Sequence, residues 1–176
     1  MHRQYLTRGS KQLGVTLVEL LIGIAILGIL AAIAVPSYTT FIANSQIRST
    51  TESIRNGLQI ARAEAVKRNA TVIFTLNTTD NSWVVGCPTA TANCPATIQS
   101  KAANEGGSGT VTVNPNSGSV TFTNLGSATS YDVNVDNTSV SAANSKELRI
   151  RVGAGGNVRV CDPNISVTTD TRFCAT

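Results

Sequence analysis

The chain has 176 residues, with 14 Lys and Arg against 10 Asp and Glu, and its only histidine is His2. Past residue 2, this composition excludes active sites and zinc sites that depend on histidine. The small net charge of +4 also excludes a domain with a large basic field over its whole surface.

Residues 15–35 form an apolar run that contains a single charge, Glu19, near its start. In a helix this run spans about 31 Å, which matches the hydrocarbon core of a bilayer. Three cations and no acid precede it, so we expect the N-terminal side to stay in the cytoplasm and the chain after Pro36 to cross the membrane. The run is longer than the core of a signal peptide, and a plain membrane anchor would tolerate Glu19 near the headgroups without explaining its position.

Residues Gly14 to Glu19 read G-V-T-L-V-E, between a basic leader and the apolar run. This stretch resembles the processing site of type IV pilins and of the related type II secretion pseudopilins. The resemblance implies that prepilin peptidase removes residues 1–14 by cutting before Val15, and that the new amino group at Val15 is methylated. It also implies a single-pass inner-membrane protein that later enters a pilus or pseudopilus, and it puts Pro36 where such proteins often carry a helix-bending proline.

Glu19 would be the fifth residue of the processed chain. A carboxylate in lipid needs a partner, and the amine freed at Val15 of a neighbouring subunit is a cation at the same depth. A subunit without this pairing would leave an uncompensated charge in lipid, so a mismatch is penalised more strongly than a match is rewarded. We therefore expect Glu19 to set the register of subunit assembly.

The helix is expected to continue beyond the bilayer to residue 69. Pro36 lacks a donor and should kink this helix without ending it. After the kink, apolar residues recur at helical spacing and predict a stripe that packs on a following domain. The stripe consists of Ile47, Ile54, Leu58, Ala61 and Ala65.

Residues 70–176 are rich in Thr, Ser, Asn, Val and Gly and contain short alternating runs separated by turn residues. This pattern predicts an antiparallel β domain and an α+β fold, with a long kinked N-terminal helix packed on C-terminal strands. The expected strands lie at 70–76, 82–86, 110–113, 119–124, 131–135, 147–152 and 157–161. Residues 58–72 also resemble the junction between helix and first strand in the FimT, FimU and type II secretion H branch of pilin-like proteins.

All four cysteines lie in the exported part, at Cys87, Cys94, Cys161 and Cys174. An even count outside the cytoplasm favours disulfides, and three pairings are possible. Pairing of nearest neighbours would close two short loops, and a loop of about fourteen residues contributes roughly 3 kcal/mol in the chain-entropy model. Zinc is a weaker alternative, because the sequence has no CxxC motif and no histidine in this part.

Arginines gather near the C-terminus, although removal of the leader leaves eleven cations against ten acids. Along 148–152 and 158–160 apolar residues alternate with arginines, so one face of a hairpin would carry Arg149, Arg151 and Arg159. A disulfide from Cys161 to Cys174 would bring Arg172 near them. Such a cluster suits phosphate, and its alternative is a solvated face balanced by nearby acids.

The same tail resembles the region through which FimT-like minor pilins bind DNA during natural transformation, where a G-R-x-R motif recurs. Here the four residues at 156–159 are Gly, Asn, Val and Arg, so asparagine stands in the place of the first arginine. A further alternative concerns Asp132, Asn134 and Asp136, which alternate like the start of a calcium loop. Neither the glycine nor the closing glutamate of such a loop follows them.

The sequence is therefore interpreted as a minor type IV pilin of the FimT/FimU kind, with no catalytic residues and no cofactor. Its expected partners are other major and minor pilins or pseudopilins, prepilin peptidase, inner-membrane lipid and, through the arginine cluster, double-stranded DNA. One alternative is the type II secretion pseudopilin H, whose anchor and junction would look the same. Another is a membrane-anchored DNA receptor.

Overall fold

A computed structural model describes residues 14–103, 105 and 109–174. The chain divides into two compact units, Met1–Tyr38 and Thr39–Thr176. Within the described ranges, one helix, α1 (Leu17–Arg68), precedes all of the strands. The strands are β1 (Val72–Leu76), β2 (Trp83–Gly86), β3 (Gln99–Lys101), β4 (Val111–Pro115), β5 (Ser119–Phe122), β6 (Tyr131–Asn137), β7 (Leu148–Val152) and β8 (Val158–Cys161).

Local interactions define where α1 begins and where it ends. Before the first turn, the Thr16 hydroxyl accepts a hydrogen bond of 3.2 Å from the backbone N–H of Glu19, as an N-cap residue does. At the other end Asn69 adopts a left-handed conformation with φ of 48°, and the N–H of Ala70 reaches back 3.1 Å to the carbonyl of Ala65. The helix runs through Pro36 without a break. The expected kink at Pro36 stays a prediction.

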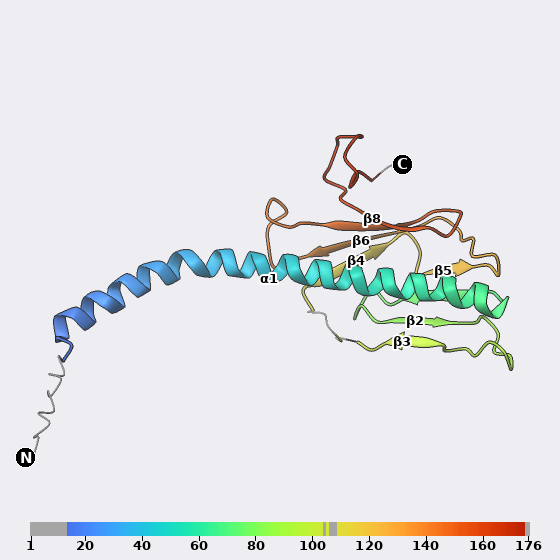
Figure 1. Cartoon of the computed structure of the whole chain (residues 1–176), viewed down its shortest axis with the longest axis horizontal. Coiled ribbons are helices and arrows are strands. Elements are labelled where there is room, and N and C mark those ends of the chain that lie inside the picture. The colour runs from blue at the N-terminus through green and yellow to red at the C-terminus, as the bar shows by residue number, and fades with distance from the viewer. Residues whose placement is uncertain (1–13, 104, 106–108, 175–176) are drawn as a thin grey trace, which may run out of the picture. The chain divides into compact units, whose positions relative to one another are not determined.

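The strands form two antiparallel sheets, ordered β3-β2-β1-β5 and β4-β6-β7-β8. Figure 1 shows β2 beside β3 in the first sheet, and β4, β6 and β8 in the second. Each of the seven stretches expected from alternation forms a strand, which confirms the α+β fold. The alternating pattern did not reveal β3, since its sequence Gln-Ser-Lys has no apolar residue. This strand exists because it pairs with β2, with Lys101 opposite Trp83.

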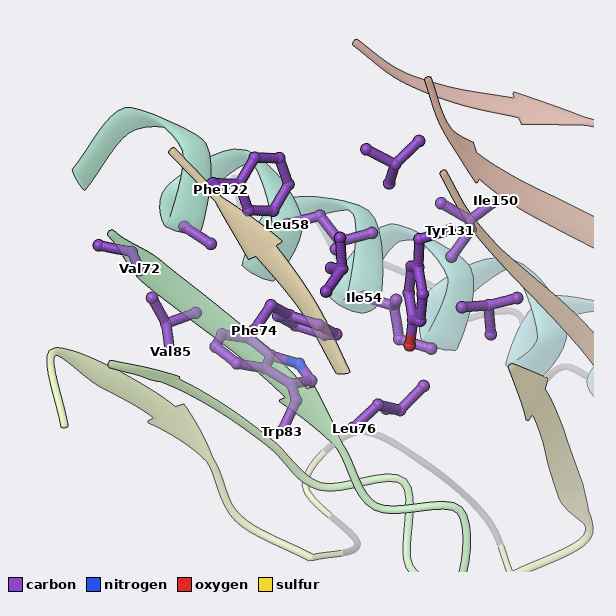
Figure 2. Close-up of a cluster of buried hydrophobic side chains, with 14 of the residues drawn as sticks. Ile54, Leu58, Val72, Phe74, Leu76, Trp83, Val85, Phe122, Tyr131 and Ile150 are labelled. Atoms are coloured by element: carbon purple, nitrogen blue, oxygen red, sulfur yellow. The ribbon is translucent and has the colours of Figure 1, made fainter. Parts of the chain in front are cut away.

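The helix stripe that was expected to pack on the strands is fully buried. Figure 2 shows two of its members, Ile54 and Leu58, among the side chains of the core. Ile54 and Leu58 lie against side chains from both sheets, and each such apolar residue contributes about 1.5–3 kcal/mol by its burial. Next to them the rings of Phe74 and Trp83 have centroids 5.8 Å apart. Gly57 allows α1 to pack closely against these rings, because a Cβ at this position would lie 2.7 Å from the Phe74 ring.

Arg62 of α1 joins loops that belong to different sheets. Its Nε donates to the carbonyl of Gly126, which follows β5, at 3.2 Å, and its Nη2 donates to the carbonyl of Gly155, between β7 and β8, at 3.3 Å. Gly126 and Gly156 both have positive φ, at 76° and 71°. A Cβ on Gly156 would lie 1.8 Å from the carbonyl oxygen of Gly126, so the two loops meet where only glycine fits.

Candidate functional site

The residues of the expected processing site lie at the start of the described chain. Gly14 and Val15 precede α1, and the Val15 side chain is 72 % exposed. A peptidase needs an extended and accessible peptide, and this segment is outside any helix or strand. Apart from Gly14, the predicted leader, residues 1–14, lies outside the described residues.

Glu19 occupies the third helical position of α1. The four residues from Thr16 to Glu19 therefore form the S/T-x-x-E pattern of a capping box, in which the glutamate can help to satisfy the free amides of the first turn. This local role competes with the expected role of Glu19 in subunit register. The pattern T-L-V-E could have indicated it in the sequence, because a Thr followed three residues later by Glu, before an apolar run, is the sequence signature of a capping box.

The first half of α1 exposes nearly every large apolar side chain that it carries. Leu17 is 74 % exposed, and similar values recur along the helix to Ile33. Among the described residues α1 contains the only stretch that is long and apolar enough to cross a membrane. Such a surface is stable in lipid or against other apolar helices, and it is unstable in water.

The cysteines pair with their nearest neighbours, as Cys87–Cys94 and Cys161–Cys174. The second bridge folds the C-terminal segment back on the end of β8. There the N–H of Asp162 donates to the carbonyl of Arg172 at 2.8 Å. The bridge therefore fixes a closed loop at the edge of the second sheet.

Three of the four candidate arginines share one face of that sheet, and two of them bind an acid or an amide of β6. Arg151 binds Asp132 on β6 with Nε–Oδ1 and Nη2–Oδ2 distances of 2.8 and 3.4 Å. Arg149 donates to Asn134 at 2.5 Å. Two of the three residues that resembled a calcium loop, Asp132 and Asn134, are thus partners of these arginines, while the third, Asp136, accepts a hydrogen bond from the Ser145 hydroxyl. Among the described residues, no group of three or more His, Cys, Asp or Glu could hold a metal ion.

The other two arginines differ in their surroundings. Arg159 lies opposite Arg151 in the β7–β8 ladder, is exposed, and forms no ion pair within the described ranges. Arg172 pairs with Asp170 at 2.9 Å, and this hydrogen bond lowers the pKa of Asp170. The Arg172 side chain also lines a groove of about 580 Å³ between α1 and β8. Of the four arginines, only Arg159 is therefore free of a partner among the described residues.

We expect the full-length chain in detergent micelles to bind duplex DNA weakly or not at all, because nearby acids neutralise Arg151 and Arg172. If three or four phosphates are contacted, the logarithm of the binding constant should fall with the logarithm of salt concentration with a slope of about −3 to −4. Replacement of Arg159 and Arg172 together by Gln should then abolish binding. A gel shift at low salt measures this, and strong binding that survives the double replacement would contradict the arginine cluster as a DNA site.

Comparisons with known proteins agree with this geometry. Residues 50–156 match the family described as type II transport protein GspH, and residues 9–35 match the prokaryotic N-terminal methylation motif. The type IV major fimbrial protein FimA of Dichelobacter nodosus is 48 % identical over 61 residues, which are 35 % of this chain and 37 % of that protein. The matched part is thus little more than a third of that relative's length.

Two solved structures share the fold at low sequence identity. The minor pilin FimU of Pseudomonas aeruginosa superposes with a TM-score of 0.53 and 16 % identity, over 68 % of this chain and 91 % of FimU. The minor pseudopilin EpsH of Vibrio cholerae superposes with a TM-score of 0.53 and 11 % identity, over 68 % of this chain and 99 % of EpsH. Because the match over residues 50–156 spans more than half of the sequence, this chain belongs to the GspH family of pilin-like proteins.

Proposed function

We propose that this protein is a minor type IV pilin, which is processed before Val15 and enters or primes a pilus through its N-terminal helix. The observation that carries the proposal is the composition of α1. Its first half is exposed and, apart from Glu19, carries no charge, whereas its second half contributes a fully buried stripe to the β core. One continuous helix thus combines an anchor for lipid or helix bundles with a folded domain.

The proposal supposes that the chain is held in the inner membrane by residues 15–35 and that residues 70–176 face the periplasm until assembly. The partners would be other pilins, which receive the apolar half of α1, and prepilin peptidase, which acts on the exposed segment around Gly14. The expectation of no catalysis and no cofactor is part of the same proposal. It is supported by membership of a family whose named relatives are fimbrial and pseudopilin proteins.

The processing site gives a direct test. We expect the membrane-extracted protein to begin at Val15 with an N-methyl group, and Gly14→Val to block cleavage because a β-branched side chain would stand at the cut peptide. Intact-mass measurement and N-terminal sequencing decide the result. A mature chain that begins at Met1, or near Val35 as after a signal peptide, would contradict the pilin proposal.

The alternative function is that of a type II secretion pseudopilin, which the family description favours. The fold does not choose between them, since the likenesses to FimU and EpsH have the same TM-score. Recovery of the protein in sheared surface pili would support the minor pilin. Loss of protein secretion on deletion, with surface pili unchanged, would support the pseudopilin. The third candidate function, a membrane-anchored DNA receptor, is tested by the gel shift described above.

A further inference from the structure

Two grooves follow one another between α1 and β8, and together we call them the α1–β8 trough. The first, of about 580 Å³, lies between α1 from Phe41 to Arg55 and the C-terminal end of β8. The second, of about 630 Å³, lies between α1 from Gln59 to Lys67 and the N-terminal end of β8. All of these residues belong to the unit Thr39–Thr176. The trough exists because α1 leaves the inward-facing side chains of the edge strand β8 only half covered.

The helix side of the trough is a regular stripe, separate from the stripe that enters the core. The lining positions follow one another at intervals of three or four residues, so they lie on one face of α1. This stripe consists of Phe41, Ser45, Arg48, Glu52, Arg55, Gln59, Arg62 and Val66.

The trough gathers most of the positive charge of the processed chain. After residue 14 the chain has eleven Lys and Arg residues, and six of them line the two grooves. Only two of its ten acidic residues, Glu52 and Asp162, do so. The six cations are Arg48, Arg55, Arg62, Lys67, Lys146 and Arg172. Glu64 pairs with Lys67 and Asp170 pairs with Arg172, so the excess positive charge of this concave surface lies mainly on Arg48, Arg55, Arg62 and Lys146.

Several of these cations lack a partner inside the protein. Arg48 and Arg55 are two turns apart on α1, are exposed, and form no ion pair among the residues that the structure describes. Lys146 is likewise without an ion pair in those ranges. Folding alone does not explain their position, because an exposed and unpaired cation adds little to stability.

Apolar side chains separate the cations. Phe41 is 68 % exposed at one end of the trough and Val66 is 53 % exposed at the other, while Val158 and Val160 form the wall on β8. A phosphate backbone would leave these apolar groups uncovered and would be repelled by Glu52 and Asp162. A peptide that alternates carboxylates with apolar residues would satisfy both kinds of surface.

We propose that the α1–β8 trough is a docking surface for an acidic segment, bearing apolar side chains, of a neighbouring pilin-like subunit. This inference rests on the proposed function, because it supposes that the chain meets such subunits in the membrane or in a filament. The contact would lie outside the lipid and would add side-specific recognition to the apolar contacts of the first half of α1.

A photocrosslinker identifies the occupant. We would place p-benzoylphenylalanine at Ser45, inside the trough, or at Asn56, which is exposed on α1 outside it, in the full-length chain in cells. The Ser45 position should crosslink to a peptide of net negative charge from a pilin-like subunit, and the Asn56 position should not. Crosslinks to nucleic acid, or to the same peptide from both positions, would overturn the inference.

Charge reversal measures the contribution of the trough. Arg55→Glu should reduce incorporation into filaments by about tenfold. The new carboxylate would face the acidic segment, and a desolvated like-charge contact costs at least about 1.4 kcal/mol of binding free energy, which is a factor of ten. Arg159→Glu, on β8 but facing away from α1, makes the same change of charge and should leave incorporation within about twofold. Equal incorporation of the two variants would overturn the inference.

The two failures can be told apart. If the wild-type chain is uncleaved or absent from filaments, the proposed function fails, whereas the crosslink at Ser45 in membranes still decides whether the trough binds an acidic subunit segment. If the wild-type chain is cleaved and incorporated but the crosslink and charge reversal have no effect, only the trough inference fails.

Discussion

Gly156→Ala should lower the unfolding midpoint of the full-length chain in detergent micelles by about 5–15 °C. A left-handed conformation costs a residue with a Cβ about 1–2 kcal/mol, and overpacking costs about 1–3 kcal/mol more. The new Cβ would lie 1.8 Å from the carbonyl oxygen of Gly126 and 3.2 Å from Nε of Arg62. It would therefore push apart the two loops that Arg62 joins. For a chain of this size each kcal/mol lowers the midpoint by about 2–4 °C.

Gly155→Ala is the matched control, since a Cβ at Gly155 meets nothing within 4 Å and its backbone is not left-handed. We expect its stability to stay within about 0.5 kcal/mol of the wild type. Fluorescence reports the transition, because Trp83 is the single tryptophan and is 4 % exposed in the core. Equal midpoints for the two alanine variants would show that the loops do not need their observed approach.

Glu19→Gln should leave cleavage and membrane insertion intact and reduce incorporation into filaments by at least about tenfold. Glutamine keeps the shape and hydrogen-bonding atoms of the side chain and also serves in a capping box, so the local helix start survives. It removes only the charge that would pair with the amine at Val15 of a neighbour. An uncompensated buried charge costs about 3–5 kcal/mol, so the neighbour's amine then opposes assembly. Immunoblots of sheared filaments and of membranes measure the ratio.

Thr16→Ala is the control for the capping role of the same motif. It removes the hydroxyl that accepts from the Glu19 amide but keeps the carboxylate, and it should weaken the first turn by about 1 kcal/mol without a large loss of incorporation. If Glu19→Gln assembles normally while Thr16→Ala does not, Glu19 acts as a local helix residue. The proposed register with the neighbour's amine would then be wrong.

Local chemistry made the helix, most strands and the fold class predictable. The buried stripe from Ile47 to Ala65 and the seven alternating strands follow from periods of 3.6 and 2 residues, which any core-forming chain must respect. By contrast, β3 has no such pattern, and only its pairing with β2 makes it a strand. The sequence also left three disulfide pairings open, because loop entropy does not specify which cysteines meet.

The sequence by itself determined the apolar first half of α1, the N-terminal methylation motif and the division into helix and β strands, since length, apolar character and spacing are properties of neighbouring residues. The tertiary structure decided how the charges are used. It pairs Arg151 with Asp132 across two strands, and it brings Arg48, Arg55 and Lys146 to one trough from segments about a hundred residues apart. Electrostatic pairing depends on the distance between charges in space. That distance is set by the register of β6, β7 and β8 and by the path of α1, which are fixed only when the core packs.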